Sequence, residues 1–261
     1  RSALQVLRLT PRSSDGQHVK RWLVEVDADA RLVKGEDAWG NITHTLFVEG
    51  PISSLTISID GEVDTRDTGG VVSGVVERLP RPLYLRETAL THPTAALRAL
   101  ARDCAAAEGG DRLATLHRLM RTIHERLRFD TEATSVATTA GEAFEAGHGV
   151  CQDFAHVMAA RPRRRGTPAR HLAGYSLRTD THEQEAGHAW TEAWVDGIGW
   201  IAFDPAHSLC VTDRYVRVAT GLDYLDAAPV RGTRIGGISE ELSVTVHVEE
   251  RAALIPVRTQ V

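Results

Sequence analysis

Cys151 stands where a reactive thiol would be useful. It comes just after the turn glycines Gly147 and Gly149 and opens a stretch of helical character that runs from 151 to 160. A helix N-terminus carries unpaired N–H groups and about half a positive charge, which stabilise a thiolate. The backbone N–H of the cysteine can also face a developing oxyanion. A small buried cysteine suits the same position, so placement alone leaves both interpretations open.

A thiol nucleophile needs a base, and the base needs an orienting group. The segment GHAWTEAWVDGIGWIAFDPAH predicts a β-hairpin with a turn at 196–198. A three-residue loop would pair Trp190 with Asp204 and place His188 diagonal to Asp204 on the same face. A slip of one residue would send the two side chains to opposite faces. If the register holds, the hairpin supplies a base and a carboxylate for Cys151.

A metal site is a weaker interpretation of the same region. His148, Cys151 and His156 have the spacing H-x-x-C-x-x-x-x-H, but no second ligand cluster accompanies them. We therefore expect no metal ion, and we expect His156 to be hydrogen-bonded in the core. No calcium-loop pattern occurs, and no cofactor is expected.

Other polar and aromatic residues have two interpretations each. Asp153 complements the dipole at the helix start and could also orient a group in a cleft. Tyr175 suits a cleft wall or core packing. Trp190, Trp194 and Trp200 could shield an intermediate, although tryptophans of paired strands more often pack in the core.

The order of elements predicts an α+β fold. Residues 1–80 hold short alternating apolar runs that predict an antiparallel β domain. The Pro-containing stretch ERLPRPLYLRE suggests a boundary, so the expected domains are 1–80 and 81–261. The second part begins with amphipathic helices and continues with strands. Predicted helices occupy 94–109 and 111–129, a third is capped by Thr139 and Glu142 and stopped by Gly147, and predicted strands occupy 169–178, 187–204, 214–220 and 242–250.

Six segments together resemble the bacterial transglutaminase-like proteins, a family within the transglutaminase-like superfamily whose members carry the name cysteine protease. The segments are GVCQDFAH, GHAWTEAWV, GWIAFDPAH, DRYVRVATGLDYLDAAPVRG, DAWGN and LPRPLYLRET. The resemblance implies a small N-terminal antiparallel β domain followed by a papain-like core. It implies a catalytic triad of Cys151, His188 and Asp204. His207 departs from the pattern, because the family often has Asn there.

Three functions remain open at this point. The first is a cysteine hydrolase that cleaves peptide or isopeptide bonds through an acyl-enzyme on Cys151, and we favour it because water needs no second-substrate site. The second is transglutaminase-type transfer of the acyl group to an amine. The third is an inactive scaffold or binding module with the same fold.

Composition limits the partners. Apolar residues make up 42% of the 261 residues, and the net charge is -5. A mildly acidic chain without an apolar run of ~20 residues gives no reason to expect a nucleic acid or membrane partner. We expect a protein or peptide substrate, and the oligomeric state is open. The three cysteines argue against a disulfide framework, with Cys104 in the core and Cys210 an inert thiol. No signal peptide is visible, so cytoplasm is the expected compartment.

The second half of the Cys151 helix breaks its own pattern. Its inward stripe runs through Phe154, Met158 and then Pro162, and an interior proline costs about 3 kcal/mol. Three explanations compete for the Arg-rich run 161–165: a helix end near Arg161 followed by a solvated loop, a patch for an acidic partner, or a local frameshift in the recorded sequence. We favour the first.

Overall fold

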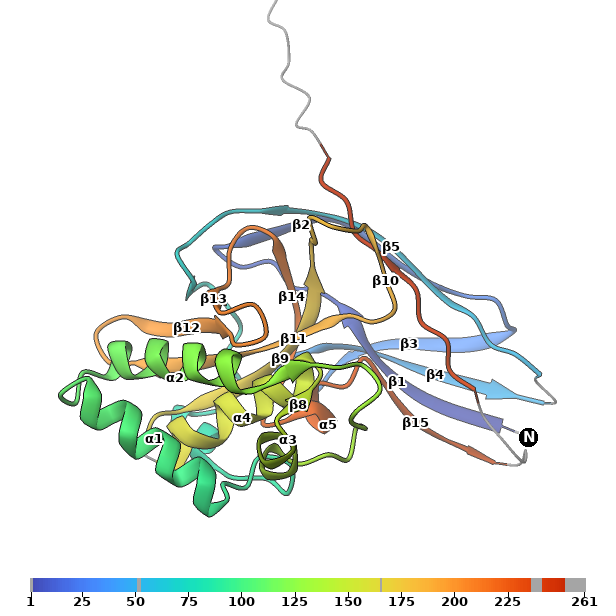
Figure 1. Ribbon diagram of the computed structural model, residues 1–261. Helices are drawn as coiled ribbons and strands as arrows, with labels where there is room; N and C mark the ends of the chain where they lie inside the picture. The colour runs from blue at the N-terminus through green and yellow to red at the C-terminus, as the bar shows by residue number, and fades with distance from the viewer. Residues whose placement is uncertain (1, 51–52, 165, 236–240, 252–261) are drawn as a thin grey trace, which may run out of the picture.

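A computed structural model describes residues 2–50, 53–164, 166–235 and 241–251 (Figure 1). The chain forms a mixed α/β structure. Its first part consists of antiparallel strands, and its second part is a sheet covered on one face by helices. This arrangement confirms the predicted fold class. Among the described residues, no helix is both long and apolar enough to span a membrane.

The core sheet is antiparallel and carries the hairpin that the sequence predicts. Its strand order is β13-β12-β11-β9-β14, and β6 adds a short pairing to β12. The central strands are buried on both faces. The strands are β6 (Val71–Val72), β9 (Ala169–Ser176), β11 (His188–Val195), β12 (Gly199–Asp204), β13 (Leu209–Cys210) and β14 (Tyr215–Gly221).

The hairpin register is the one that the turn predicts. Val195 pairs with Gly199, so residues 196–198 form the loop. Gly197 and Gly199 adopt φ of 83° and 116°, which only glycine adopts easily. Thr191 lies opposite Phe203, and the next position in this register sets Trp190 against Asp204.

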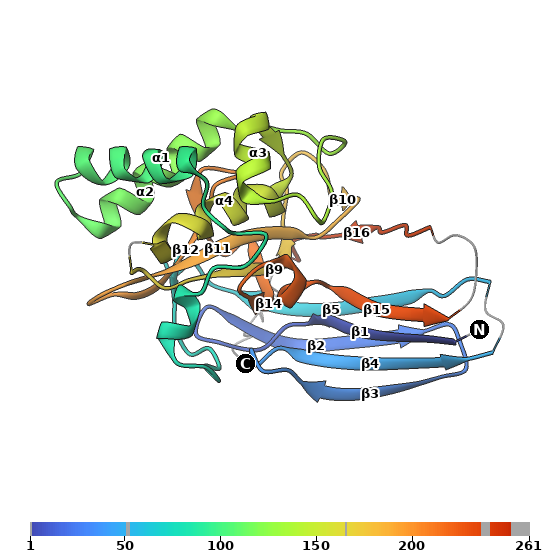
Figure 2. The ribbon, with the colours of Figure 1, turned by 90° about the horizontal axis from the view of Figure 1, so that it is seen from below.

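Four helices gather on one face of the core sheet (Figure 2). The first two begin at side-chain caps, because Thr94 accepts from the amide of Leu97 and Asp111 from that of Ala114. Most apolar residues on the inner faces of these two amphipathic helices are buried, Leu97, Cys104 and Ile123 included, and Leu113 is partly buried. The helices are α1 (Ala95–Ala107), α2 (Arg112–Arg126), α3 (Ala140–Ala146) and α4 (Cys151–Arg164), with a short α5 (Tyr224–Ala227) and a 3-10 turn η1 (Arg81–Leu85) elsewhere.

Helix α4 differs from expectation in two ways. Residues 152–160 are all buried, not only one stripe, because α1, α2 and α3 pack on one side of α4 and the strands β9 and β11 on the other. The helix also continues to Arg164, so the expected end near Arg161 is wrong. A proline removes one N–H donor and bends a helix without necessarily ending it. The side chains of the Arg-rich run lie outside the described residues.

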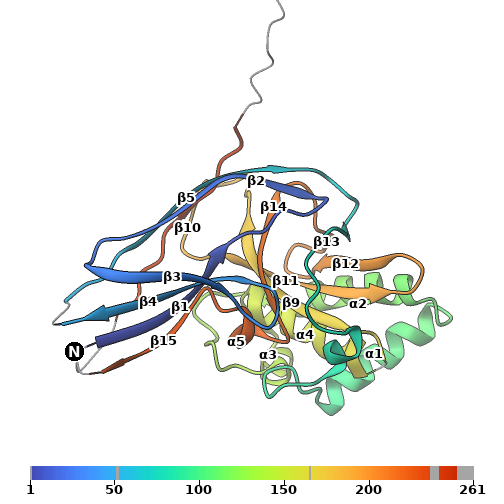
Figure 3. The same ribbon diagram turned by 180° about the vertical axis from the view of Figure 1, so that it is seen from behind.

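The N-terminal strands form two antiparallel sheets that extend away from the helices (Figures 1 and 3). One has the order β15-β1-β4-β3, and the other pairs β2 with β5. The strands are β1 (Ser2–Thr10), β2 (Gln17–Val26), β3 (Ala30–Glu36), β4 (Ile42–Glu49), β5 (Ile57–Thr65) and β15 (Val230–Ile235). Strand β15 comes from the far end of the chain, and the boundary at 80 stays a prediction.

The prediction of a strand over residues 242–250 is mostly wrong. Only β16 (Val246–His247) forms there, pairing with β10 (Glu183–Gln184). Most side chains of this segment are exposed, so the alternation of apolar residues buries little surface.

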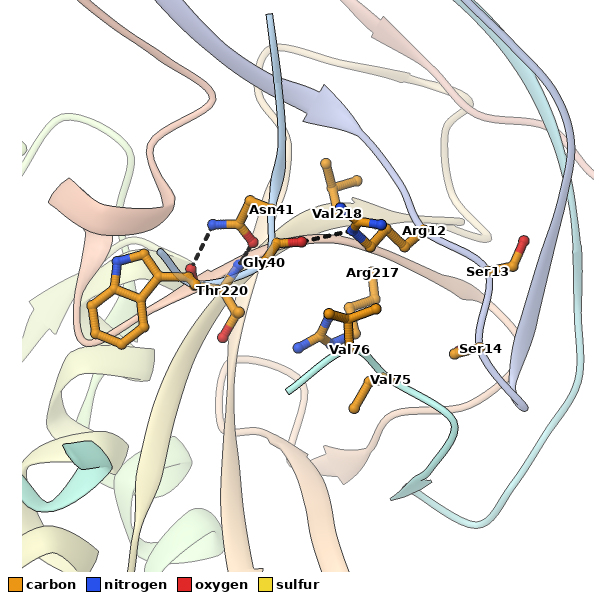
Figure 4. Close-up of a pocket in the computed structure, with 11 residues that line it drawn as sticks. Arg12, Ser13, Ser14, Gly40, Asn41, Val75, Val76, Arg217, Val218 and Thr220 are labelled. Atoms are coloured by element: carbon orange, nitrogen blue, oxygen red, sulfur yellow. Dashed lines mark hydrogen bonds between the residues drawn. The ribbon is translucent and has the colours of Figure 1, made fainter. Parts of the chain in front are cut away.

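Asn41 joins the N-terminal sheet to the core sheet (Figure 4). Its side chain donates to the carbonyl of Thr220 and accepts from the amide of Thr220, both at 2.8 Å. Arg12 donates to the carbonyl of Gly40 at 2.6 Å beside it. The segment DAWGN therefore ties β4 to β14, which is a structural role for a motif that the sequence offers only as a resemblance.

Candidate active site

A tightly capped turn places Cys151 at the first position of α4. Thr139 and Glu142 form a reciprocal capping box at the start of α3, as predicted. Gly147 ends α3 with φ of 74°, also as predicted. The strand β8 (His148–Gly149) then pairs in parallel with β7 (Arg128–Phe129), and the chain enters α4 two residues later.

The buried side chain of Asp153 stabilises the turn that leads into α4. Its Oδ2 accepts from the amide of Val150 at 2.9 Å and from the hydroxyl of Thr134 at 2.6 Å. The side chain is fully buried, and burial raises the pKa of Asp153. A Cβ on Gly149 would lie 2.6 Å from this oxygen, so glycine is needed there. Of the two roles considered for Asp153, the contacts fit support of the helix start.

His188 connects Asp204 to Cys151. Its Nε2 lies 2.7 Å from Oδ2 of Asp204, and the side chain of Cys151 is close enough to the same ring to raise the pKa of His188. Because Nε2 is engaged by Asp204, Nδ1 is the nitrogen available to the thiol. The three side chains that the sequence singles out therefore meet at one place. Cys151 is partly exposed.

The environment favours a charged imidazole. Burial by itself would lower the pKa of His188, but the hydrogen bonds to Asp204 and Cys151 raise it to about 10. Burial opposes ionisation of Asp204 too, yet hydrogen bonds from His188 and His207 hold the pKa of Asp204 below its usual value. The raised pKa of His188 and the lowered pKa of Asp204 both indicate a carboxylate and an imidazolium that stabilise each other.

Asp204 also receives contacts that sequence reasoning missed. Its Oδ1 accepts from the amides of Ala206 at 2.9 Å and His207 at 3.3 Å. Its Oδ2 accepts from the hydroxyl of Tyr215 at 2.7 Å and lies 2.8 Å from Nδ1 of His207. Burial, followed by the interaction with Asp204, raises the pKa of Tyr215. The departure from the family pattern at His207 is the one signal that pointed to this network.

A hydrogen bond between α4 and β11 sets the spacing between the cysteine and the histidine. The buried hydroxyl of Thr191 donates to the carbonyl of Ala155 at 2.8 Å. Ala155 lies about one turn after Cys151, and Thr191 lies three residues after His188 on β11. This contact was not foreseen, because pairing between a helix and a strand leaves no local pattern in the sequence.

Buried charges hold the neighbouring strands together. Glu192 is fully buried and lies 2.5 Å from Arg170 on β9 and 2.8 Å from Arg217 on β14. Arg170 is also fully buried, and its guanidinium lies 4.0 Å from the ring centre of Trp200. This network links three strands of the core sheet. Neighbouring residues of a strand point to opposite faces, so Glu192 lies on the face of the sheet opposite Thr191 and helix α4.

The remaining predicted residues take structural positions. His156 is fully buried, and its Nε2 accepts from the amide of Tyr224 at 3.0 Å, as expected for a core histidine. Tyr175 packs 6.0 Å from Trp22, and burial raises the pKa of Tyr175 to about 12. Cys104 is buried as expected, and burial raises the pKa of Cys104.

The three tryptophans differ in how close they lie to the candidate site. Trp190 is buried, its ring stacks 6.2 Å from that of His188, and it crosses Tyr215 edge-on at 5.5 Å. Trp194 and Trp200 pack against each other at 5.6 Å, on the side of the sheet where Trp200 meets Tyr84. Only Trp190 is therefore adjacent to the site.

One cluster has donor atoms close enough to consider a metal ion. Among the described residues, atoms of His188, Asp204 and His207 lie within 4.8 Å of one another. Their separations from the carboxylate, 2.7 and 2.8 Å, are hydrogen-bond distances. We assign these atoms to the hydrogen-bond network of the site.

Two parts of the chain match known families. Residues 98–205 match the Transglutaminase-like superfamily, and residues 1–64 match the Bacterial transglutaminase-like N-terminal region. The chain belongs to the transglutaminase-like superfamily, which confirms the resemblance found in the sequence.

Relatives share most of this length. An uncharacterised protein of Mycobacterium leprae (strain TN) is 29% identical over 260 residues, covering 94% of this chain and 91% of that protein. An uncharacterised protein of Mycobacterium bovis (strain ATCC BAA-935 / AF2122/97) is 30% identical over 249 residues, covering 86% and 79%. A protein-glutamine gamma-glutamyltransferase of Pseudomonas aeruginosa is 28% identical over 165 residues, which cover 56% of this chain and 24% of that protein.

A solved structure shares the fold. The structure named "a Putative Cysteine Protease from Cytophaga hutchinsonii" superposes with a TM-score of 0.73 at 19% identity, over 97% of this chain and 87% of that one. The likeness extends over both the N-terminal strands and the papain-like core.

Proposed function

We propose that this protein is a cysteine hydrolase that cleaves peptide or isopeptide bonds through an acyl-enzyme on Cys151. One observation carries the proposal: the ring of His188 is hydrogen-bonded to the buried carboxylate of Asp204 and interacts with the side chain of Cys151, which helps to raise the pKa of His188. Nucleophile, base and orienting group in this order are what thiol-dependent acyl chemistry needs.

The first half-reaction follows from the charges. The imidazole of His188 holds the proton that the thiol of Cys151 has given up, and the Cys151 sulfur attacks the carbonyl carbon of the amide. The carbonyl electrons move to oxygen, and the backbone N–H of Cys151, in the first turn of α4, is the donor that we assign to that oxyanion. When the C–N bond breaks, the imidazolium protonates the leaving amine and a thioester remains on Cys151.

The second half-reaction decides between hydrolysis and transfer. In hydrolysis, His188 accepts a proton from water, and the water oxygen attacks the thioester carbon. The C–S bond then breaks, the product acid is released, and the Cys151 thiolate is regenerated beside the protonated His188. The partial exposure of Cys151 gives water access to the thioester, and this supports hydrolysis. In transfer, an amine would take the place of water.

The test compares the wild type with Cys151→Ala on two substrates. We expect the wild type to cleave a fluorogenic peptide library and the variant to lose cleavage. Incorporation of a labelled amine into a glutamine peptide, faster than cleavage, would replace hydrolysis with acyl transfer. Cleavage that survives in Cys151→Ala would contradict the proposal, and a wild type inactive in both assays would favour the scaffold interpretation.

A protein or peptide as the partner and the cytoplasm as the compartment stay predictions. Fractionation of the cells that make the protein, followed by detection with an antibody, tests the compartment.

A further inference from the structure

His207 stacks on the histidine of the site and shares its carboxylate. The ring centres of His188 and His207 lie 4.8 Å apart with 26° between the planes. Nδ1 of His207 lies 2.8 Å from Oδ2 of Asp204 and 3.0 Å from the hydroxyl oxygen of Tyr215. Two imidazoles therefore compete for one carboxylate oxygen.

The partners of His207 fix which ring nitrogen carries hydrogen. An ionised carboxylate only accepts hydrogen bonds, so we assign a hydrogen to Nδ1 of His207. That hydrogen points at the same oxygen that receives Nε2 of His188 and the hydroxyl of Tyr215. Asp204 thus spreads its charge over three donors on one oxygen.

We propose that His207 is a positioning residue that shares Asp204 with His188 and so weakens the hold of His188 on its proton. The inference rests on the proposed function, in which His188 must give that proton to a leaving amine. A general acid works best when its proton affinity matches the working pH, and a buried ion pair with an undivided carboxylate would hold the proton too firmly.

Two physical effects act in the same direction. A neutral His207 donates to Asp204 and draws carboxylate charge away from His188. A doubly protonated His207 would also place a positive charge 4.8 Å from the His188 ring and disfavour a second cation there. The side chain of His207 is 44% exposed, so water can exchange protons with it.

The other titratable groups near His207 also lower the proton affinity of His188. Tyr215 donates to Asp204 in the same way as His207. His124 of α2 contacts the loop that follows Asp204. Its Nδ1 lies 3.2 Å from the carbonyl oxygens of Pro205 and Ala206. Protonation of His124 would add positive charge and favour a neutral His188, as His207 does.

The test measures the titration of the His188 ring directly. In protein labelled with 15N-histidine, the His188 signals are assigned by their loss in His188→Gln and followed against pH by NMR. In His207→Leu, which cannot donate, we expect the His188 midpoint to rise by about half to one pH unit, a roughly three- to tenfold higher proton affinity. His207→Asn keeps an N–H donor without a charge and should lie between His207→Leu and the wild type. His92→Asn, a change at an exposed histidine paired with Glu87, is the control and should leave the midpoint in place.

A midpoint in His207→Leu that equals the wild type or falls below it would overturn the inference. So would a His207→Asn midpoint at or above that of His207→Leu. The readout needs no substrate, so it separates the two claims. Loss of the midpoint shift with peptide cleavage intact refutes only the role of His207. A shifted midpoint in a protein that cleaves no amide refutes only the proposed function.

Discussion

Nε2 of His188 lies 2.7 Å from Oδ2 of Asp204, across a hairpin that separates the two residues by sixteen positions. The contact depends on the register of that hairpin, since a slip of one residue would place the side chains on opposite faces. It also orients the ring, because Asp204 engages Nε2 and leaves Nδ1 to Cys151. Strand pairing thus determines which ring nitrogen of His188 faces the carboxylate and which faces the thiol.

Replacing Asp204 by Asn should reduce catalysis without removing the contact geometry. The amide is nearly the same size but carries no charge, so the imidazolium loses its stabilising partner. We expect kcat for peptide cleavage to fall by a factor of about 100 or more. Steady-state kinetics at pH 7 measures this, and near-ultraviolet circular dichroism checks that the fold is kept. A fall of less than about threefold would contradict the assigned role.

The ion pair should make stability depend on pH with a definite sign. The pKa of His188 is raised to about 10 from an unfolded value of about 6.5, so its stabilisation is complete below about pH 6.5 and is lost as pH rises towards 10. The pKa of Asp204 is lowered, so its share is present above about pH 4 and is lost in more acidic solution. The Tm difference between the wild type and His188→Gln should therefore be largest near pH 5–6 and shrink towards pH 10. A difference that grows with rising pH would have the wrong sign.

Glu192→Gln should destabilise the fold while leaving Cys151, His188 and Asp204 in place. It removes the charge that compensates the buried Arg170 and Arg217, at a cost of about 3 kcal/mol in the free energy of unfolding. Urea unfolding measures the loss. The triple variant Arg170→Met, Glu192→Leu and Arg217→Met should recover part of it, since it removes all three charges of the network and leaves only the partly exposed Glu77 without its arginine. A single variant as stable as the wild type would show that the buried network contributes little.

Gly149→Ala should disturb the start of α4. The new Cβ would meet Oδ2 of Asp153 at 2.6 Å, and this oxygen binds the amide of Val150. We expect the alkylation rate of Cys151 at pH 6 to fall by roughly tenfold, because the helix start moves away from His188. Gly166→Ala is a useful contrast, since a Cβ there meets no atom within 4 Å, although its φ of 76° adds local strain. An unchanged rate in Gly149→Ala would mean that the turn is more tolerant than its contacts suggest.

Much of the site could be predicted because its determinants are local. The turn residues and alternation set the hairpin register, and Thr139, Glu142 and Gly147 fixed the helix before the cysteine through short-range hydrogen bonds. The glycines that precede Cys151 likewise predicted the start of its helix. Each of these signals lies within a few residues of the feature it specifies.

The rest could not be predicted because it depends on distant partners. Strand β15 pairs with β1 although all six of its residues are exposed, so no alternation marks it. Tyr215 reaches Asp204 only because β14 and β11 both pair with β9. The uniform burial of 152–160 likewise depends on three helices and two strands that surround α4.

The rate of Cys151 alkylation at pH 6 tests the central claim most directly. The account predicts that iodoacetamide modifies Cys151 first, before Cys104 and Cys210, because burial raises the pKa of both of those thiols. It further predicts that His188→Gln slows Cys151 by at least about tenfold, since the thiolate loses its imidazolium partner. Site-resolved mass spectrometry measures all three rates in one reaction. A Cys151 that reacts no faster than the other two, or as fast without His188 as with it, would contradict a thiol activated by this histidine.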